Sequence, residues 1–278
     1  MDGVAKPDLI VDGYASPHGF ALKPTHAKML QEADLVFWVG EDLENFLKKP
    51  LKSIAKKAEK IELMGIKGLT KLKFRERNIF DEHGHKEDEH GHKEDEHGHK
   101  EDEHGHDEHA HGEHDPHIWL DPMNAKVILS EMAEHLIEND SKNEAKYKAN
   151  LKRAHKDLDQ LTKKVKSELN KDFKSIVFHD AYQYFEKRFD INILGAFTVN
   201  TDVMPGAEQL AEIREVIEHD KVSCVFSEPQ FNPDIIKAVA KDTNIATGVI
   251  DPLAATLNPG KDLYFDLIGN MSKSFKGC

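Results

Sequence analysis

Histidine is concentrated in one short stretch of the chain, where its spacing suits metal capture. A seven-residue unit, Glu-His-Gly-His-Lys-Glu-Asp, begins at Glu82 and recurs at Glu89 and Glu96, with a degenerate fourth copy from Glu103. Imidazole is a common ligand for zinc, copper and nickel, and His-Gly-His places two rings on one side of an extended chain. We therefore interpret the stretch as a secondary metal-capture region that consists of His83, His85, His90, His92, His97, His99, His104, His106, His109, His111 and His114.

The segment that carries these histidines, residues 81–115, is predicted to be a disordered loop. It contains 15 acidic residues and three lysines, and so holds −12 of the net charge of −13. A coiled coil needs two apolar positions in each seven-residue repeat, and this unit has none. An acidic solubilising spacer is the alternative, although a spacer has no need of histidine. The rest of the chain is nearly neutral, so composition favours neither a nucleic acid nor another polyanion as a partner.

Three further histidines stand at the ends of predicted elements, where a rigid scaffold presents ligands. His18 follows a short predicted strand, His117 lies where the charged segment meets apolar sequence, and His179 directly follows an apolar run. Taken singly, a histidine at a strand end is more often a structural hydrogen-bonding group than a ligand. The other four histidines lie in helical stretches among lysine and glutamate and are expected on the solvated surface: His26, His135, His155 and His219.

Short strands and helices alternate in the first part of the chain. Strands are predicted over residues 9–11, 35–39 and 61–63, and helices over 25–33, over 43–47 and from residue 51. The run from 35 to 39 is apolar without a break, which is typical of a strand that is covered on both faces.

A long helix is predicted over residues 142–170, after a shorter one over 125–138. Its apolar residues recur at spacings of three and four: Tyr147, Leu151, Ala154, Leu158, Leu161, Val165 and Leu169. About 29 helical residues span roughly 43 Å, so we interpret this helix as a strut between two lobes.

The last part alternates again, with strands predicted over 175–178, 191–196, 222–227 and 246–250 and helices over 182–188, 207–219, 233–241 and 263–275. The pattern predicts an α/β fold of two lobes with mainly parallel sheets, joined by the long helix, with the histidine-rich loop inserted in the first lobe. The expected boundaries are 1–141 for the first lobe, 142–171 for the linking helix and 172–278 for the second lobe. Ligands of such lobes bind at the carboxyl ends of the strands.

Two cysteines occur, Cys224 inside an apolar strand and Cys278 at the last position. They are too far apart to form a Cys-x-x-Cys metal-ligand pair. A disulfide would join the C-terminal helix to the sheet. The alternative is two free thiols, one buried and one at the chain end.

Six motifs occur together in a fixed order: Ala-Ser-Pro-His-Gly-Phe at 15–20, Ala-Asp-Leu-Val-Phe-Trp-Val-Gly at 33–40, the histidine-rich segment, His-Ile-Trp-Leu-Asp-Pro at 117–122, Phe-His-Asp-Ala-Tyr at 178–182 and Cys-Val-Phe-Ser-Glu-Pro-Gln-Phe at 224–231. With them, nearly the whole chain resembles the ZnuA type of periplasmic zinc-binding protein of bacterial ABC importers. The resemblance implies a zinc ion in a cleft between the lobes, with His18, His117 and His179 as ligands. It also implies a disulfide between Cys224 and Cys278.

The fourth zinc ligand stays open between Glu44, Asp251 and water. Glu44 matches an acidic position of the family near the cleft, and Asp251 matches an aspartate that binds manganese in relatives. Those relatives carry a carboxylate in place of His179, so an imidazole there favours zinc over manganese. Three neutral imidazoles with one open or oxygen position form a normal zinc site.

The resemblance implies a monomeric carrier that captures zinc in the periplasm and delivers it to the membrane permease of an ABC importer, without a catalytic step. A zinc hydrolase is the rival interpretation, because three histidines and a water also form a catalytic arrangement. Its general base would be Glu44 or Asp251, but the sequence lacks His-Glu-x-x-His. A third interpretation is a metal buffer in which the histidine-rich loop is the whole function.

Family members begin with a signal peptide, a strand and a helix ahead of the stretch that matches residues 2–4. These segments are absent here, so we expect a truncated or trimmed start and a first lobe without its first strand. No apolar run approaches the roughly 18 residues that span a bilayer, so a membrane-embedded protein is not expected.

Overall fold

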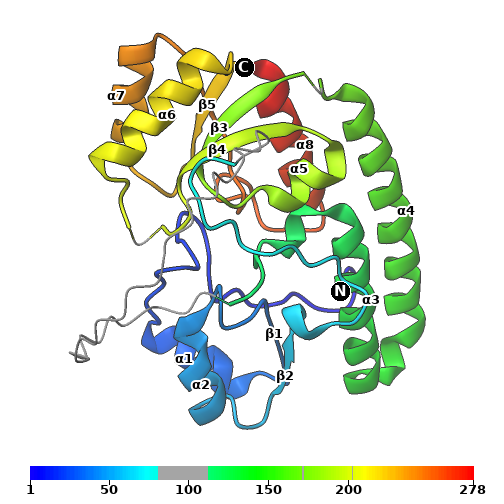
Figure 1. Cartoon of the computed structure of the whole chain (residues 1–278). Helices are drawn as coiled ribbons and strands as arrows, with labels where there is room; N and C mark the ends of the chain where they lie inside the picture. The colour runs from blue at the N-terminus through cyan, green and yellow to red at the C-terminus, as the bar shows by residue number, and fades with distance from the viewer. Residues whose placement is uncertain (81–111, 171, 202) are drawn as a thin grey trace, which may run out of the picture.

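The structure of the chain is a computed structural model that describes residues 1–80, 112–170, 172–201 and 203–278. Its two parallel sheets lie towards opposite ends of the molecule, and its two longest helices run along one side (Figure 1). The disordered loop and the capture histidines from His83 to His111 fall outside the described residues, so both stay predictions. Within the described ranges, no helix is both long enough and apolar enough to cross a membrane.

The first lobe is built on a two-stranded parallel sheet of β1 (Leu35–Trp38) and β2 (Glu59–Glu62). The helices α1 (Pro24–Glu32) and α2 (Lys48–Ser53) pack beside it around a small apolar cluster that includes Trp38. These elements confirm the alternation of strand and helix that the sequence predicts here.

Two local predictions for this lobe are wrong. Residues 9–11 form no strand: Leu9 is 44% exposed, and β1 and β2 pair with each other and leave this short run without a partner strand. The helix predicted over 43–47 is a single 3-10 turn at Asn45–Leu47. Pro50 lacks a backbone N–H and is therefore suited to the first turn of a helix, where the N–H groups have no partner within the helix. Accordingly, α2 begins at Lys48, so that Pro50 lies in its first turn.

The second lobe contains a four-stranded parallel sheet in the order β4–β3–β5–β6. Its strands are β3 (Lys174–His179), β4 (Asn192–Thr198), β5 (Cys224–Ser227) and β6 (Ala246–Val249), and its helices are α5 (Gln183–Phe189), α6 (Ala207–His219), α7 (Asp234–Thr243) and α8 (Leu263–Gly277). The strands β3 and β4 are buried on both faces, as is usual for parallel strands covered by helices. All predicted elements of this part are present.

The helices α3 (Pro122–Asn139) and α4 (Glu144–Glu168) lie side by side (Figure 1). Asp121 caps the start of α3, because its carboxylate accepts the backbone N–H of Met123 at 2.8 Å. α4 has 25 residues and packs against α3 and, in the second lobe, against α8. This confirms the long backbone helix, although residues 141–143 form a separate 3-10 turn before it.

One apolar core runs through both lobes. It joins Ile61 of β2 with Ile118 and Leu120, which follow His117, and with Val177 of β3 and Phe275 of α8. The stretch that includes His117 is therefore packed at the centre of the molecule.

Residues 78–80 reach across to the second lobe and extend its sheet at β4. The N–H of Phe80 donates to the carbonyl of Leu194 at 2.8 Å, and the N–H of Ala196 donates to the carbonyl of Asn78 at 2.8 Å. Ile79 and Gly195 form the antiparallel bridge between them. A Cβ on Gly195 would lie 2.6 Å from the carbonyl oxygen of Asn78, so this close approach requires glycine.

A disulfide joins Cys224, the first residue of β5, to Cys278 at the end of α8. The two Cα atoms are 5.8 Å apart. This confirms the pairing that the family resemblance implies, and it excludes the alternative of two free thiols.

Candidate metal centre

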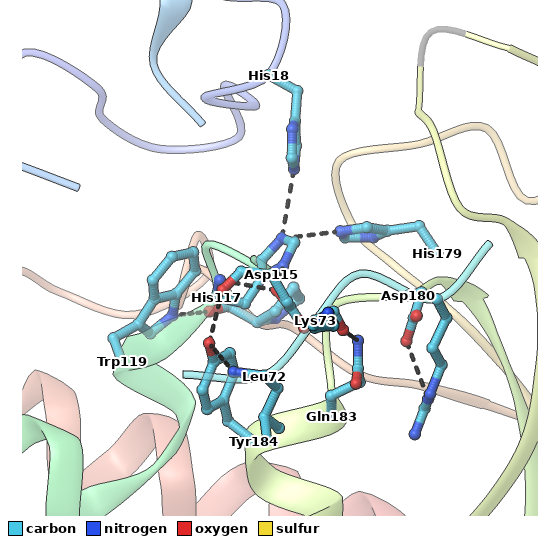
Figure 2. Close-up of polar contacts among 12 residues, drawn as sticks. His18, Leu72, Lys73, Asp115, His117, Trp119, His179, Asp180, Gln183 and Tyr184 are labelled. Carbon is cyan, nitrogen blue, oxygen red and sulfur yellow. Dashed lines mark hydrogen bonds and ion pairs between the residues drawn. The ribbon is translucent and has the colours of Figure 1, made fainter. Parts of the chain in front are cut away.

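Three histidines from distant parts of the sequence meet at one point. The Nε2 atoms of His18 and His179 each lie 3.3 Å from Nε2 of His117, and the candidate ligand atoms of all three lie within 4.8 Å of one another. Figure 2 places His117 in the middle, with His18 and His179 pointing towards it from different segments. These are the three ligands that the family resemblance implies.

His179 is held by a carboxylate from the neighbouring strand. It is the last residue of β3, and Glu228 directly follows β5, which pairs with β3 in parallel. The carboxyl ends of parallel strands meet at one edge, so the two side chains lie together. The Nδ1 atom of His179 is 2.8 Å from Oε1 and 2.9 Å from Oε2 of Glu228, and both residues are buried.

His117 is held in the same way by a carboxylate two residues earlier in the chain. Its Nδ1 lies 2.7 Å from Oδ1 of Asp115, which also accepts the backbone N–H of His117 at 2.9 Å. The hydroxyl of Tyr184 donates to the carbonyl of Asp115 at 2.7 Å, and the indole of Trp119 donates to the carbonyl of Pro252 at 2.9 Å. Residues of the second lobe therefore anchor the segment that presents His117.

His18 approaches from the first lobe. It follows the buried Pro17 in a segment without regular secondary structure, and it is partly exposed, whereas His117 and His179 are buried. Its backbone N–H donates to the hydroxyl of Ser16 at 3.3 Å. Two of the three rings are thus fixed against the second lobe, and the third comes from the opposite side.

The two carboxylates decide which ring nitrogen is available. When Nδ1–H of His117 and His179 donates to Asp115 and Glu228, Nε2 keeps its lone pair, and the Nε2 atoms are the ones that converge. Two nitrogen ligands about 2.05 Å from one zinc ion, at the tetrahedral angle, are separated by about 3.35 Å. The two separations of 3.3 Å match that value.

Burial shapes the charges around this point. Burial lowers the pKa of His117 well below its usual value, and the neighbouring His179 lowers it further. Burial also lowers the pKa of His179, but the charge and hydrogen bond of Glu228 and the charges of Asp180 and Asp115 together outweigh it, so the net shift is upward. Burial raises the pKa of Asp115 to about 7, and its Oδ2 atom is buried without a hydrogen bond among the described residues. A dication at the Nε2 atoms would favour the ionised carboxylate.

Glu44 and Asp251 lie outside the group of converging ligand atoms. The Oε2 atom of Glu44 accepts the backbone N–H groups of Val39 at 2.6 Å and Gly40 at 3.2 Å, and burial raises the pKa of Glu44 to about 7. The Oδ1 atom of Asp251 accepts from Gln230 at 2.9 Å and from the backbone of Leu253 at 3.2 Å. Glu44 as the fourth ligand stays a prediction.

Sequence reasoning missed the roles of Asp115 and Glu228. Asp115 was counted with the charged loop, yet it is fully buried against His117. Glu228 occurs in the Ser-Glu-Pro sequence after β5, and a carboxylate at a strand end next to His179 was an available signal. His114, one of the predicted capture histidines, forms an antiparallel bridge to Lys73.

Comparisons with known proteins identify the family of the chain and relate its fold to a solved structure. The family model described as "Zinc-uptake complex component A periplasmic", ZnuA, matches residues 1–278. The high-affinity zinc uptake system protein ZnuA of Brucella abortus (strain 2308) is 46% identical over 288 residues, which cover 100% of this chain and 86% of that protein. The corresponding protein of Yersinia pestis is 39% identical over 281 residues, covering 100% and 85%. A crystal structure of ZnuA superposes with a TM-score of 0.76 at 23% identity, covering 99% of this chain and 90% of that one.

Proposed function

The chain belongs to the ZnuA family of periplasmic zinc-uptake components, and from this premise we propose that it carries zinc to an ABC importer. His18, His117 and His179 bind one zinc ion between the lobes, and the loaded protein delivers the ion to the membrane permease. It acts in the periplasm, as a monomer and without catalysing a reaction. The histidines of the charged loop capture further zinc at lower affinity.

The convergence of the three Nε2 atoms carries the proposal. Two imidazole nitrogens at 3.3 Å with their protons on Nδ1 would place lone pair against lone pair, unless a cation lies between them. Imidazole ligands suit zinc, whereas manganese prefers oxygen. The donor set therefore favours zinc over manganese.

The anchoring of the rings suggests how the ion is held and released. His117 and His179 are fixed against the second lobe, and His18 comes from the first lobe on a segment without regular structure. We assign His18 the closing of the site over a zinc ion already held by the other two. The fourth position falls to Glu44 or to water, and zinc affinity of the Glu44→Gln variant separates these two alternatives.

A hydrolase fits the site less well. A general base must reach a zinc-bound water, yet Asp115 and Glu228 direct their oxygens at Nδ1 atoms, on the far side of the rings from the Nε2 atoms. Asp251 is engaged by its own loop. A carrier needs only the ligand set.

The test compares His18→Ala with His26→Ala, two imidazole deletions in the same lobe. Zinc-finger-type sites total about 10–16 kcal/mol, so the loss of one of three imidazoles should weaken binding by about 3 kcal/mol, or more than a hundredfold. His26 accepts the N–H of Lys23 at the start of α1, away from the cluster, and its loss should leave affinity unchanged. Competition with a fluorescent zinc chelator measures both. Equal affinities would refute the site.

A further inference from the structure

A second group of possible metal ligands lies in the first lobe, far from the three-histidine centre. It combines Glu59, the first residue of β2, with His135 and Glu138 of α3, and the candidate ligand atoms lie within 4.8 Å of one another. His135 is 13 residues beyond Pro122, where α3 begins, a distance of about 20 Å along the helix. The group is thus separate from the proposed carrier site.

Three glutamates surround His135, two on the same helix and one on a strand of the neighbouring sheet: Glu131 and Glu138 of α3, and Glu59 of β2. Glu131, His135 and Glu138 lie four and three residues apart, so they share one face of α3. Glu59 is brought to that face by the sheet, because its backbone N–H donates to the carbonyl of Asp34 at 2.9 Å and it stands beside Leu35 in the register of β1 and β2. The arrangement therefore rests on regular secondary structure.

The ring of His135 is placed as a metal ligand would be. Its Nδ1 lies 2.9 Å from Oε1 of Glu59, yet this nitrogen is buried and forms no hydrogen bond within the described part of the chain. Its Nε2 faces Oε1 of Glu131 at 3.5 Å. A proton on Nε2, directed at Glu131, leaves the lone pair of Nδ1 facing Glu59. The ring of Phe37 stands edge to face with that of His135, with 6.3 Å between the ring centroids.

The charge of the group also calls for a cation. No ion pair with a lysine or arginine is found for Glu59, Glu131 or Glu138 among the described residues; Glu59 and Glu131 pair with His135. Three carboxylates around one imidazole repel each other unless positive charge is added. The side chain of His135 is only 20% exposed, so the expectation that it is a solvated surface residue is wrong.

We propose that Glu59, His135 and Glu138 form a second zinc site that joins β2 to α3, with Glu131 directing the ring. One imidazole and two carboxylates are a normal donor set for zinc, and the exposed glutamates leave room for water as a further ligand. The proposal does not depend on the function proposed for the three-histidine centre.

The experiment follows the imidazole signals of the full chain, with isotope-labelled histidine, by NMR at pH 7.5 during zinc titration. The His135 signal is identified by its absence from the His135→Gln protein. We expect it to shift once zinc exceeds what the three-histidine centre takes up. Since loss of an outer-shell partner already costs about 10–100-fold in metal affinity, Glu59→Gln and Glu138→Gln should raise the midpoint of this shift at least about tenfold.

The matched control is Glu134→Gln, an exposed glutamate on the same helix that does not belong to the group. It should leave the midpoint unchanged. A His135 signal that does not shift in excess zinc would overturn the proposal. So would midpoints in Glu59→Gln and Glu138→Gln that equal the midpoint of the wild-type protein.

Discussion

Replacing Glu228 by glutamine tests how the protein prepares His179 for zinc. Glutamine keeps the size of the side chain and an oxygen that accepts the Nδ1–H, but it removes the negative charge. In the structure both carboxylate oxygens lie within 2.9 Å of Nδ1, and Glu228 is only 3% exposed. Little solvent screens the interaction, so loss of the charge should be felt directly by the ring and by the metal beyond it.

The expected loss is at the upper end of the usual range. Outer-shell carboxylates of metal-bound histidines contribute about 10–100-fold in affinity, or about 1.4–2.7 kcal/mol. We expect a loss near a hundredfold at pH 8, because the contact is buried and involves both oxygens.

The pH dependence distinguishes this effect from a simple packing defect. Burial lowers the pKa of His179, but the charge and hydrogen bond of Glu228, together with the charges of Asp180 and Asp115, outweigh it and raise the pKa above its usual value. Zinc must displace the proton from His179 in the wild-type protein as the pH falls through this raised pKa. In Glu228→Gln the largest contribution that opposes burial is lost, while burial and the charges of Asp180 and Asp115 remain, so the pKa of His179 falls and proton competition starts at lower pH. The difference in zinc affinity between the two proteins should therefore narrow from pH 8 to pH 6.

Isothermal titration with a competing chelator, repeated at several pH values, measures the difference. Glu212→Gln, an exposed substitution on α6, serves as the control and should match the wild-type protein at every pH. If the loss in Glu228→Gln were below about threefold at pH 8, or constant across the pH range, the assigned role of Glu228 would be refuted.

Two further predictions concern the chain around the site. Deleting residues 81–111 should remove the weaker zinc equivalents bound by the histidines of that stretch and keep the one tight site, because Asp115 stays to hold His117; calorimetry counts the sites, and loss of the tight one would contradict the three-histidine assignment. Reducing the disulfide between Cys224 and Cys278, which are 54 residues apart, should lower the free energy of unfolding by about 4 kcal/mol in the chain-entropy model and spare zinc affinity. The melting temperature and the zinc affinity, the latter by chelator competition, are measured with and without reductant. An unchanged melting temperature or a reduced zinc affinity would contradict this prediction.

Elements with long or unbroken apolar patterns could be predicted from the sequence. The apolar residues of α4 recur at helical spacing along one stripe, which indicates a helix. The mostly apolar sequences of β3 and β4 indicate strands that are buried on both faces. His179 was found because it ends such a run. Residues 9–11 misled because a short apolar run becomes a strand only when a neighbouring strand offers hydrogen bonds.

Contacts between distant segments could not be read from the sequence. No local pattern indicates that Asn78 hydrogen-bonds to Ala196, or that Tyr184 holds Asp115. His135 also looked like any helical surface histidine, because Glu59 joins it only through the packing of β2 on α3. The three ligands were named from family motifs, whereas Glu228 reaches His179 through the pairing of β3 with β5, and Asp115 reaches His117 from two residues earlier in the chain.

The strand-like contact of residues 78–80 with β4 has a consequence for solubility. An edge strand offers unpaired backbone groups to other chains and so invites aggregation. Of the two edges of the second sheet, β4 is seven residues long and almost entirely buried, and it is covered by the hydrogen bonds from Phe80 and to Asn78. The opposite edge, β6, has four residues, and short edge strands are poor templates for pairing. The chain thus shields its longer and more apolar edge with a segment from more than a hundred residues earlier.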